Sequence, residues 1–325
     1  MDFKETFKTG RWCNAIEVKN FVSLNISPYN GDHRFLEGPT ASTQRLWDLC
    51  RAALKEERQN NGLRDVDVNI VSGMKAFNAG YIERESEVIV GLQTDKLLKR
   101  AMKPYGGYNV VKKALSEHGL KPNEVIDECF GKYTKTHNDG VFDAYTEEIR
   151  TFRSLGFLTG LPDNYARGRI IGDYRRVALY GINRLIEAKK EDLDNIHGPM
   201  NDATIRLREE VSEQIRALYD MIGMGKIYDL DLSRPAQNAR EAVQWTYMAY
   251  LAAVKEQDGA AMSLGSVSSF LDIFIEKDLQ ENKITEADAQ EYIDQFVMKL
   301  RMVRHLRMEA YDQIFAGDPT WVTES

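Results

Sequence analysis

Two arginines, Arg167 and Arg169, are the residues whose type and spacing best suit chemistry. They lie in the run Arg-Gly-Arg-Ile-Ile-Gly-Asp-Tyr-Arg-Arg, at the start of a helix predicted over residues 167–190. A helix dipole disfavours cations at its N-terminus by a few tenths to about 1 kcal/mol, so another interaction has to favour them there. A bound anion would do so, and a carboxylate matches the fork of a guanidinium. The alternative is ion pairing with nearby acids such as Asp163 and Asp173, and the residues alone leave both interpretations open.

Two further segments are weaker candidates. The small residues of 258–269 allow close approach of a ligand, or simply form a tight packing turn. They are not a phosphate loop, because the sequence Gly-x-x-x-x-Gly-Lys-Ser/Thr is missing. His137 lies in a polar stretch with a glycine, where it could act as an acid or base or make a structural hydrogen bond.

The three cysteines, Cys13, Cys50 and Cys129, are widely spaced, and none has a histidine or a second cysteine nearby in sequence. This pattern indicates neither a disulfide framework nor a zinc site, and the remaining histidines suggest no metal-ligand set. We therefore expect small core residues rather than nucleophiles, in a protein of the reducing cytoplasm.

The elements that must position these residues are mostly helices. Periodic apolar residues and capping signals predict helices over residues 41–57, 110–118, 123–133, 145–155, 167–190, 202–222, 238–256 and 285–307. Ile293, Phe296, Val297, Leu300 and Val303 form the predicted buried stripe of the last helix. Alternation over residues 66–71 predicts a strand, whereas residues 88–93 could be a buried strand or a helix end.

Composition indicates a globular protein. The chain has 325 residues, of which 43% are hydrophobic and 29% charged, with a net charge of −7. This composition argues against disorder and against nonspecific binding of nucleic acid. The sequence lacks the run of about 18 apolar residues that a membrane helix needs, and its first residues do not resemble a signal peptide. With no repeat and no linker, we expect one continuous domain over residues 1–325.

Several long runs resemble the pyruvate formate-lyase family of glycyl-radical enzymes. The resemblance covers nearly the whole chain in order, and its runs are too long to be generic motifs. They lie at residues 135–143, 158–163, 167–181, 238–254, 259–263, 298–304 and 317–321.

The resemblance implies a fold and an activity. The fold would be the predominantly helical N-terminal portion of a ten-stranded α/β barrel. The reaction would convert pyruvate and coenzyme A to acetyl-coenzyme A and formate in anaerobic glucose metabolism. The family uses no permanently bound cofactor but carries a glycyl radical, installed by a radical-SAM activating enzyme. A cytoplasmic homodimer without nucleic-acid or membrane partners is implied.

By the same resemblance, Arg169 is similar to one of two arginines that hold the pyruvate carboxylate. Ala260 matches a position that lines the substrate, and Phe315 and Trp321 match aromatic walls of the pocket. A small apolar enclosure suits radical chemistry because it excludes water and side reactions.

The chain departs from the family pattern in three ways. It has no pair of adjacent cysteines, no glycyl-radical motif and no second carboxylate arginine. We therefore expect an N-terminal part of a longer enzyme that is inactive by itself. A 2-oxobutyrate formate-lyase is one alternative. The other is a non-catalytic remnant, or a split-enzyme subunit that binds a second chain.

Overall fold

A computed structural model of the chain was analysed. It describes residues 6–28, 38–104, 107–134, 136, 142–143, 145–158, 170–256, 261–304, 306 and 321–323, with only the backbone described at 170, 171, 261 and 321–323.

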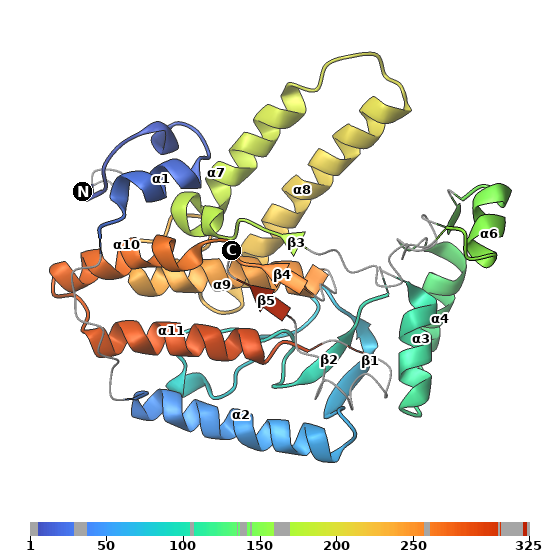
Figure 1. Cartoon of the computed structure of the whole chain (residues 1–325), viewed down its shortest axis with the longest axis horizontal. Helices are drawn as coiled ribbons and strands as arrows, with labels where there is room; N and C mark the ends of the chain where they lie inside the picture. The colour runs from blue at the N-terminus through green and yellow to red at the C-terminus, as the bar shows by residue number, and fades with distance from the viewer. Residues whose placement is uncertain are drawn as a thin grey trace.

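Helices make up most of the described chain (Figure 1). They are α1 (Val18–Asn25), α2 (Ala41–Gln59), α3 (Tyr108–Glu117), α4 (Glu124–Glu128), α6 (Glu147–Ser154), α7 (Arg175–Asp194), α8 (Asp202–Lys226), α9 (Ala239–Glu256), α10 (Val267–Gln280) and α11 (Glu286–Arg301), with short turns η2 (Arg11–Cys13), η3 (Arg84–Ser86) and η4 (Cys129–Tyr133). Most predicted helices are confirmed to within a few residues. The predicted helix 123–133 divides into α4 and the π-helical turn η4, and the last predicted helix ends at Arg301 rather than at 307.

Helix α9 is the centre of the main hydrophobic core. Val243, Tyr247 and Leu251 are at most 1% exposed, as their shared face predicts. Burial extends around the rest of the helix because α7, α8, α10 and α11 all pack against it. In Figure 1, α9 lies between α10 and α11, and α7 and α8 rise from it as a long hairpin.

The strands form two small parallel sheets. In the first, β1 (Asp65–Val71) pairs with β2 (Lys99–Met102), which confirms the strand predicted at 66–71. In the second, β4 (Ala261–Ser263) lies between β3 (Ile170–Ile171) and β5 (Trp321–Thr323). The segment 88–93 is neither strand nor helix. Its backbone is satisfied by side chains instead, as when Gln244 bonds both the N–H and the C=O of Val90 at 2.7 and 2.9 Å.

Two predictions about buried residues are wrong. Val297 is 56% exposed, whereas its neighbours Phe296 and Leu300 in the predicted stripe are buried. The five apolar residues of the stripe extend around a wider arc of the helix than the arc that packs against the core, so Val297 faces outward. Cys50 is buried as expected, but Cys129 is exposed, because it lies in the peripheral turn η4.

Two fully buried lysines differ sharply in their surroundings. The Nζ of Lys299 lies 2.5 Å from the Glu87 carboxylate and 3.2 Å from the carbonyl oxygen of Gly91. Lys255 is 0% exposed, and its Nζ has no hydrogen-bond partner in the described part of the chain. The nearby Lys103 donates to the carbonyl oxygen of Val254 instead. Burial, reinforced by Lys103, lowers the pKa of Lys255 to about 8.

Replacing each lysine by methionine should therefore change stability in opposite directions. We expect Lys299→Met to lower the free energy of unfolding by about 3 kcal/mol, because it leaves Glu87 buried without a counter-charge. Lys255→Met should raise that free energy near pH 7, because it removes an unpaired buried ammonium. Urea unfolding followed by circular dichroism measures both changes.

The pH dependence provides a second readout for Lys255. The folded-state pKa lies below the ordinary value of 10.5, so between about pH 8 and pH 10.5 the unfolded chain binds more protons. The contribution of Lys255 to the free energy of unfolding should therefore rise by roughly 3 kcal/mol across that pH window. Lys255→Met should lack this rise. An identical pH profile in both proteins would contradict the assignment.

No helix in the described ranges combines the length and the apolar character needed to cross a membrane.

Candidate functional site

The three-stranded sheet brings together three distant parts of the sequence. Ile170 in β3 is in register with Met262 in β4, and Ala261 in β4 is in register with Trp321 in β5. All three strands are parallel, so their first residues gather at one edge of the sheet, with neighbouring strands about 4.8 Å apart. This edge, formed by the starts of β3, β4 and β5, is the candidate site.

Three of the four site residues predicted from the sequence are next to these strand starts along the chain. Arg169 directly precedes β3, Ala260 directly precedes β4, and Trp321 is the first residue of β5. Arg169, Ala260 and Phe315 lie outside the described residues, and of Trp321 only the backbone is described. His137 and the Arg167 position also lie outside them. The structure thus places the strands that follow these residues, while the side-chain roles stay predictions.

The predicted helix start at residue 167 is wrong. Residues 170–171 form strand β3, and α7 begins only at Arg175. The β-branched Ile-Ile pair joins the sheet through β4, and Gly172 then allows a tight turn. A Cβ at Gly172 would lie 2.6 Å from the Tyr174 ring, which folds back over it. Tertiary pairing therefore overrides the helical spacing, and the helix-dipole argument for an anion at Arg169 no longer holds.

The turn between β3 and α7 is held by charged groups, of which the sequence analysis considered only Asp173. Asp173 accepts from Arg175 Nε at 2.7 Å and lies 3.6 Å from Arg176 Nε. Arg175 Nη1 also donates to the carbonyl oxygen of Ser266, at the start of α10. These contacts tie the end of β3 to the turn after β4. Asp173, one of the two acids considered as partners for Arg167 and Arg169, already pairs with two other arginines.

Tyrosine rings from the start of α7 and from α9 pack against one another. The rings of Tyr174 and Tyr250 meet edge to face at 5.8 Å, and Tyr250 stacks on Tyr247 at 6.3 Å. Burial raises the pKa of Tyr174 to about 12 and raises the pKa of Tyr247 well above its ordinary value. These phenols therefore stay protonated at neutral pH and supply neither a base nor a nucleophile.

The described residues contain no evident catalytic group. Burial raises the pKa of Cys50 to about 12, so its thiol is a packing group rather than a nucleophile. No group of three or more His, Cys, Asp or Glu side chains within the described ranges could hold a metal ion.

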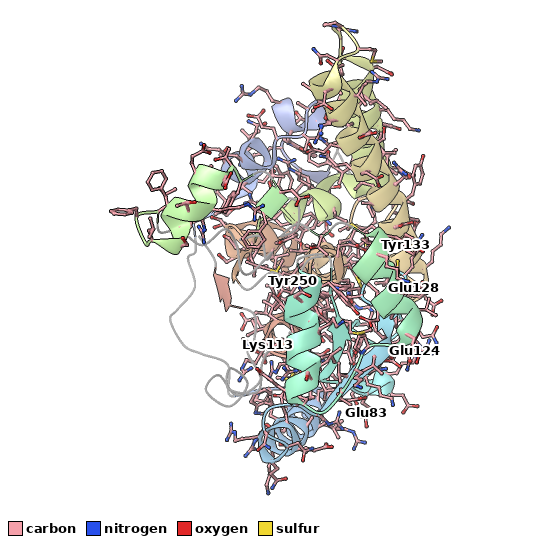
Figure 2. The ribbon with its side chains drawn as sticks, turned by 90° about the vertical axis from the view of Figure 1, so that its right-hand side faces the viewer. Glu83, Lys113, Glu124, Glu128, Tyr133 and Tyr250 are labelled. Atoms are coloured by element: carbon pink, nitrogen blue, oxygen red, sulfur yellow. The ribbon has the colours of Figure 1, made fainter. Side chains whose placement is uncertain are left out.

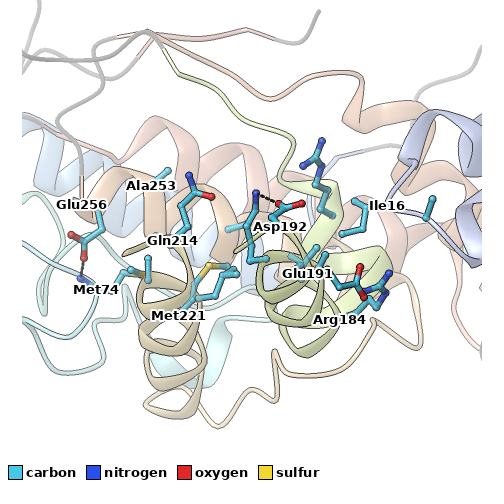
Figure 3. Close-up of a pocket in the computed structure, with 18 of the residues that line it drawn as sticks. Ile16, Met74, Arg184, Glu191, Asp192, Gln214, Met221, Ala253 and Glu256 are labelled. Carbon is cyan, nitrogen blue, oxygen red and sulfur yellow. Dashed lines mark hydrogen bonds and ion pairs between the residues drawn. The ribbon is translucent and has the colours of Figure 1, made fainter. Parts of the chain in front are cut away.

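A cavity of about 740 Å³ lies elsewhere, between α7, α8 and the end of α9 (Figure 3). Several alanines line it, together with the charged residues Arg184, Glu191 and Asp192. Several of these charges are already paired, as Arg184 with Glu191 and Lys189 with Asp192. Its described lining residues come mainly from α7, α8 and α9, and Arg176 at the start of α7, just after the turn that follows β3, is among them.

Comparison with known proteins gives a consistent result along the whole chain. The family model described as "Pyruvate formate lyase-like" matches residues 11–325. Formate acetyltransferase 1 of Escherichia coli strain K12 is 50% identical over 328 aligned residues. That alignment includes 99% of this chain but only 43% of the relative, so this chain spans less than half the length of the enzyme it matches.

Solved structures with low sequence identity share the fold. The B12-independent glycerol dehydratase from Clostridium butyricum matches with a TM-score of 0.67 at 16% identity, over 90% of this chain and 43% of that one. A structure concerned with 1,2-propanediol dehydration in Roseburia inulinivorans matches with a TM-score of 0.60 at 19% identity, over 88% and 43%. A glycyl radical enzyme from Archaeoglobus fulgidus gives 0.50 at 15% identity, over 79% and 37%. The predicted fold class, a mostly helical portion of a glycyl-radical-enzyme barrel, is confirmed.

Proposed function

The chain belongs to the pyruvate formate lyase-like family, and we propose that it is the N-terminal part of a formate acetyltransferase. The observation that carries this proposal is the 50% identity to a formate acetyltransferase along 99% of the chain. The proposed reaction converts pyruvate and coenzyme A to acetyl-coenzyme A and formate. A cytoplasmic homodimer, a radical-SAM activating enzyme and a single N-terminal domain over residues 1–325 belong to the same proposal.

In this proposal the chain supplies substrate binding. Arg169 holds the substrate carboxylate through paired charge-assisted hydrogen bonds. Ala260, Phe315 and Trp321 form an apolar wall that excludes water from reactive intermediates. The gathering of the starts of β3, β4 and β5 at one sheet edge supports this arrangement, because residues 169, 260 and 321 lie at those starts.

The radical chemistry needs groups that these 325 residues do not contain. Adjacent cysteines would carry the radical and the acetyl thioester, but Cys13, Cys50 and Cys129 are isolated in sequence and do not fit that role. We therefore expect the chain to be inactive by itself. The same observation favours a second candidate, a split-enzyme subunit that binds a chain carrying the cysteine pair.

An anaerobic reconstitution tests the proposal. The chain is co-expressed with the remaining part of the E. coli formate acetyltransferase 1 and supplied with its activating enzyme, pyruvate and coenzyme A. We expect acetyl-coenzyme A only when both parts are present. Turnover by the chain alone would contradict the division of roles, and no turnover by the pair would contradict the proposed activity. Repeating the assay with 2-oxobutyrate in place of pyruvate tests the alternative substrate. The two substrates differ by one methylene, which changes the free energy of discrimination by only about 1–3 kcal/mol.

The carboxylate role of Arg169 can be tested in the same active pair. Arg169→Lys keeps the charge but loses the two-pronged geometry, which should cost about 1.5–3 kcal/mol, or roughly a 10–150-fold loss in kcat/KM for pyruvate. Arg216→Lys, on an exposed arginine of α8, is the control and should change little. An unchanged kcat/KM for Arg169→Lys would reject the assignment.

A further inference from the structure

Four large apolar side chains gather at the end of α6. Phe152, Leu155, Phe157 and Leu158 are 47%, 63%, 77% and 46% exposed. We call these four residues the α6 patch. Figures 1 and 2 both show α6 standing away from the main body of the molecule, so the patch is not part of the central core.

The α6 patch has a defined local structure. Thr146 caps the start of α6 by accepting from the Ile149 N–H at 3.3 Å. At its end the N–H groups of Phe157 and Leu158 donate to the Phe152 carbonyl oxygen at 2.9 and 3.2 Å, across Gly156 with φ 77°. The Phe152 and Phe157 rings meet edge to face at 6.3 Å. This glycine-dependent helix stop brings Phe152 and Phe157 into contact, with Leu155 and Leu158 close by in sequence.

The size of the α6 patch indicates what kind of surface covers it. Isolated exposed apolar residues are ordinary, but a cluster of this kind marks an interaction site. Its four side chains expose on the order of 500 Å², given about 150–250 Å² for a large side chain. A stable dimer of two copies needs about 800 Å² from each partner. The patch is therefore too small to be a symmetric interface by itself, and it fits one part of a larger one.

We propose that the α6 patch is a docking surface for the remaining part of the formate acetyltransferase fold. This inference rests on the proposed function. The chain spans 43% of its relative, so a complete family fold contains a larger second part that these residues do not supply. The patch lies beside Arg150 and Arg153 of α6, so the docking partner should present an apolar centre with acidic residues near those two arginines.

Co-purification with the remaining part of the E. coli formate acetyltransferase 1 tests the docking surface. The double variant Leu155→Ser with Phe157→Ser removes the two most exposed members of the patch. Leu207→Ser with Val297→Ser removes two other exposed apolar side chains, 48% and 56% exposed, on α8 and α11 and serves as the control. Both variants should keep the thermal midpoint of the chain, since exposed substitutions change stability little. We expect the patch variant to bind the second part at least tenfold more weakly, with the control unchanged.

Three results would overturn the inference. They are equal binding by the patch variant, no binding by the unmodified chain, or loss of a homodimer rather than of the two-part complex. Failure of the docking surface can be distinguished from failure of the proposed function. A complex that depends on the patch but makes no acetyl-coenzyme A keeps the docking surface and rejects the activity. An active complex whose formation is unaffected by the patch variant supports the proposed activity and rejects the docking surface.

Discussion

Replacing Gly181 by alanine should cost about 3–5 kcal/mol of folding stability, enough to unfold many domains of this kind. Gly181 interrupts α7 with φ 69° and ψ 160°, a conformation that only glycine adopts readily. An added Cβ would lie 2.4 Å from the Arg234 carbonyl carbon and 2.7 Å from the Pro235 nitrogen. The segment around Arg234 cannot withdraw easily, because Ser233 accepts from the Asn183 N–H and Ala236 donates to the Ala178 carbonyl oxygen.

Gly119→Ala is the matched control for this prediction. Gly119 has nearly the same φ, 71°, but no atom lies within 4 Å of the position its Cβ would take. Only the backbone strain of about 1–2 kcal/mol applies there. Urea unfolding of both variants separates steric overlap from strain. Equal losses of stability would show that the close approach to Arg234 and Pro235 is not what requires glycine in α7.

Replacing Glu57 by glutamine should destabilise the protein by about 4 kcal/mol. The Glu57 carboxylate is 1% exposed and pairs with two fully buried arginines. Arg304 Nε lies 3.0 and 3.1 Å from its two oxygens, and Arg100 Nη2 lies 3.2 Å from one of them. The substitution keeps the shape of the side chain but removes the carboxylate that Arg100 and Arg304 share, so the buried Arg304 guanidinium loses the Glu57 counter-charge. This carboxylate therefore joins α2, β2 and the segment that follows α11.

The adjacent Glu56 provides the control for Glu57. Its side chain is 50% exposed and pairs with the partly exposed Arg64 at 2.7 Å. Solvent screening limits such a pair to about 0–1 kcal/mol, so Glu56→Gln should change stability little. Equilibrium unfolding in urea compares the two. A loss below 1 kcal/mol for Glu57→Gln would mean that the buried network does not stabilise the fold.

Periodic apolar spacing predicted most of the long helices, although no helix was predicted over the residues of α10 (Val267–Gln280). The buried positions of α9 and the capping box of α11 both follow from local sequence, and Thr285 and Asp288 bond one another's backbone N–H as expected. Local rules predicted neither the start of α7 nor the break inside it. Its first turn depends on β3 pairing with β4, a contact between residues 170 and 262, and its break at Gly181 depends on the segment after Leu232.

The candidate site shows the same limit. Arg169 was a candidate from its residue type and from family resemblance, but the helix start that first drew attention to it does not exist. The convergence of β3, β4 and β5 could not be predicted from spacing, because two-residue and three-residue strands carry almost no periodic signal. Asp173 was considered as a partner of Arg167 and Arg169. Its pairing with Arg175 was missed for a similar reason, since Arg175 also donates to the distant Ser266 carbonyl oxygen.

The sequence by itself determined the helical class of the protein, its family, and the absence of adjacent cysteines among these 325 residues. Those features depend on residue identity and on neighbours within a few positions. Tertiary structure decided which charges are paired in the interior, where α7 begins and breaks, and which edge of the sheet gathers residues from three distant segments. These features arise from contacts between residues tens to hundreds of positions apart, and a local pattern does not encode such contacts.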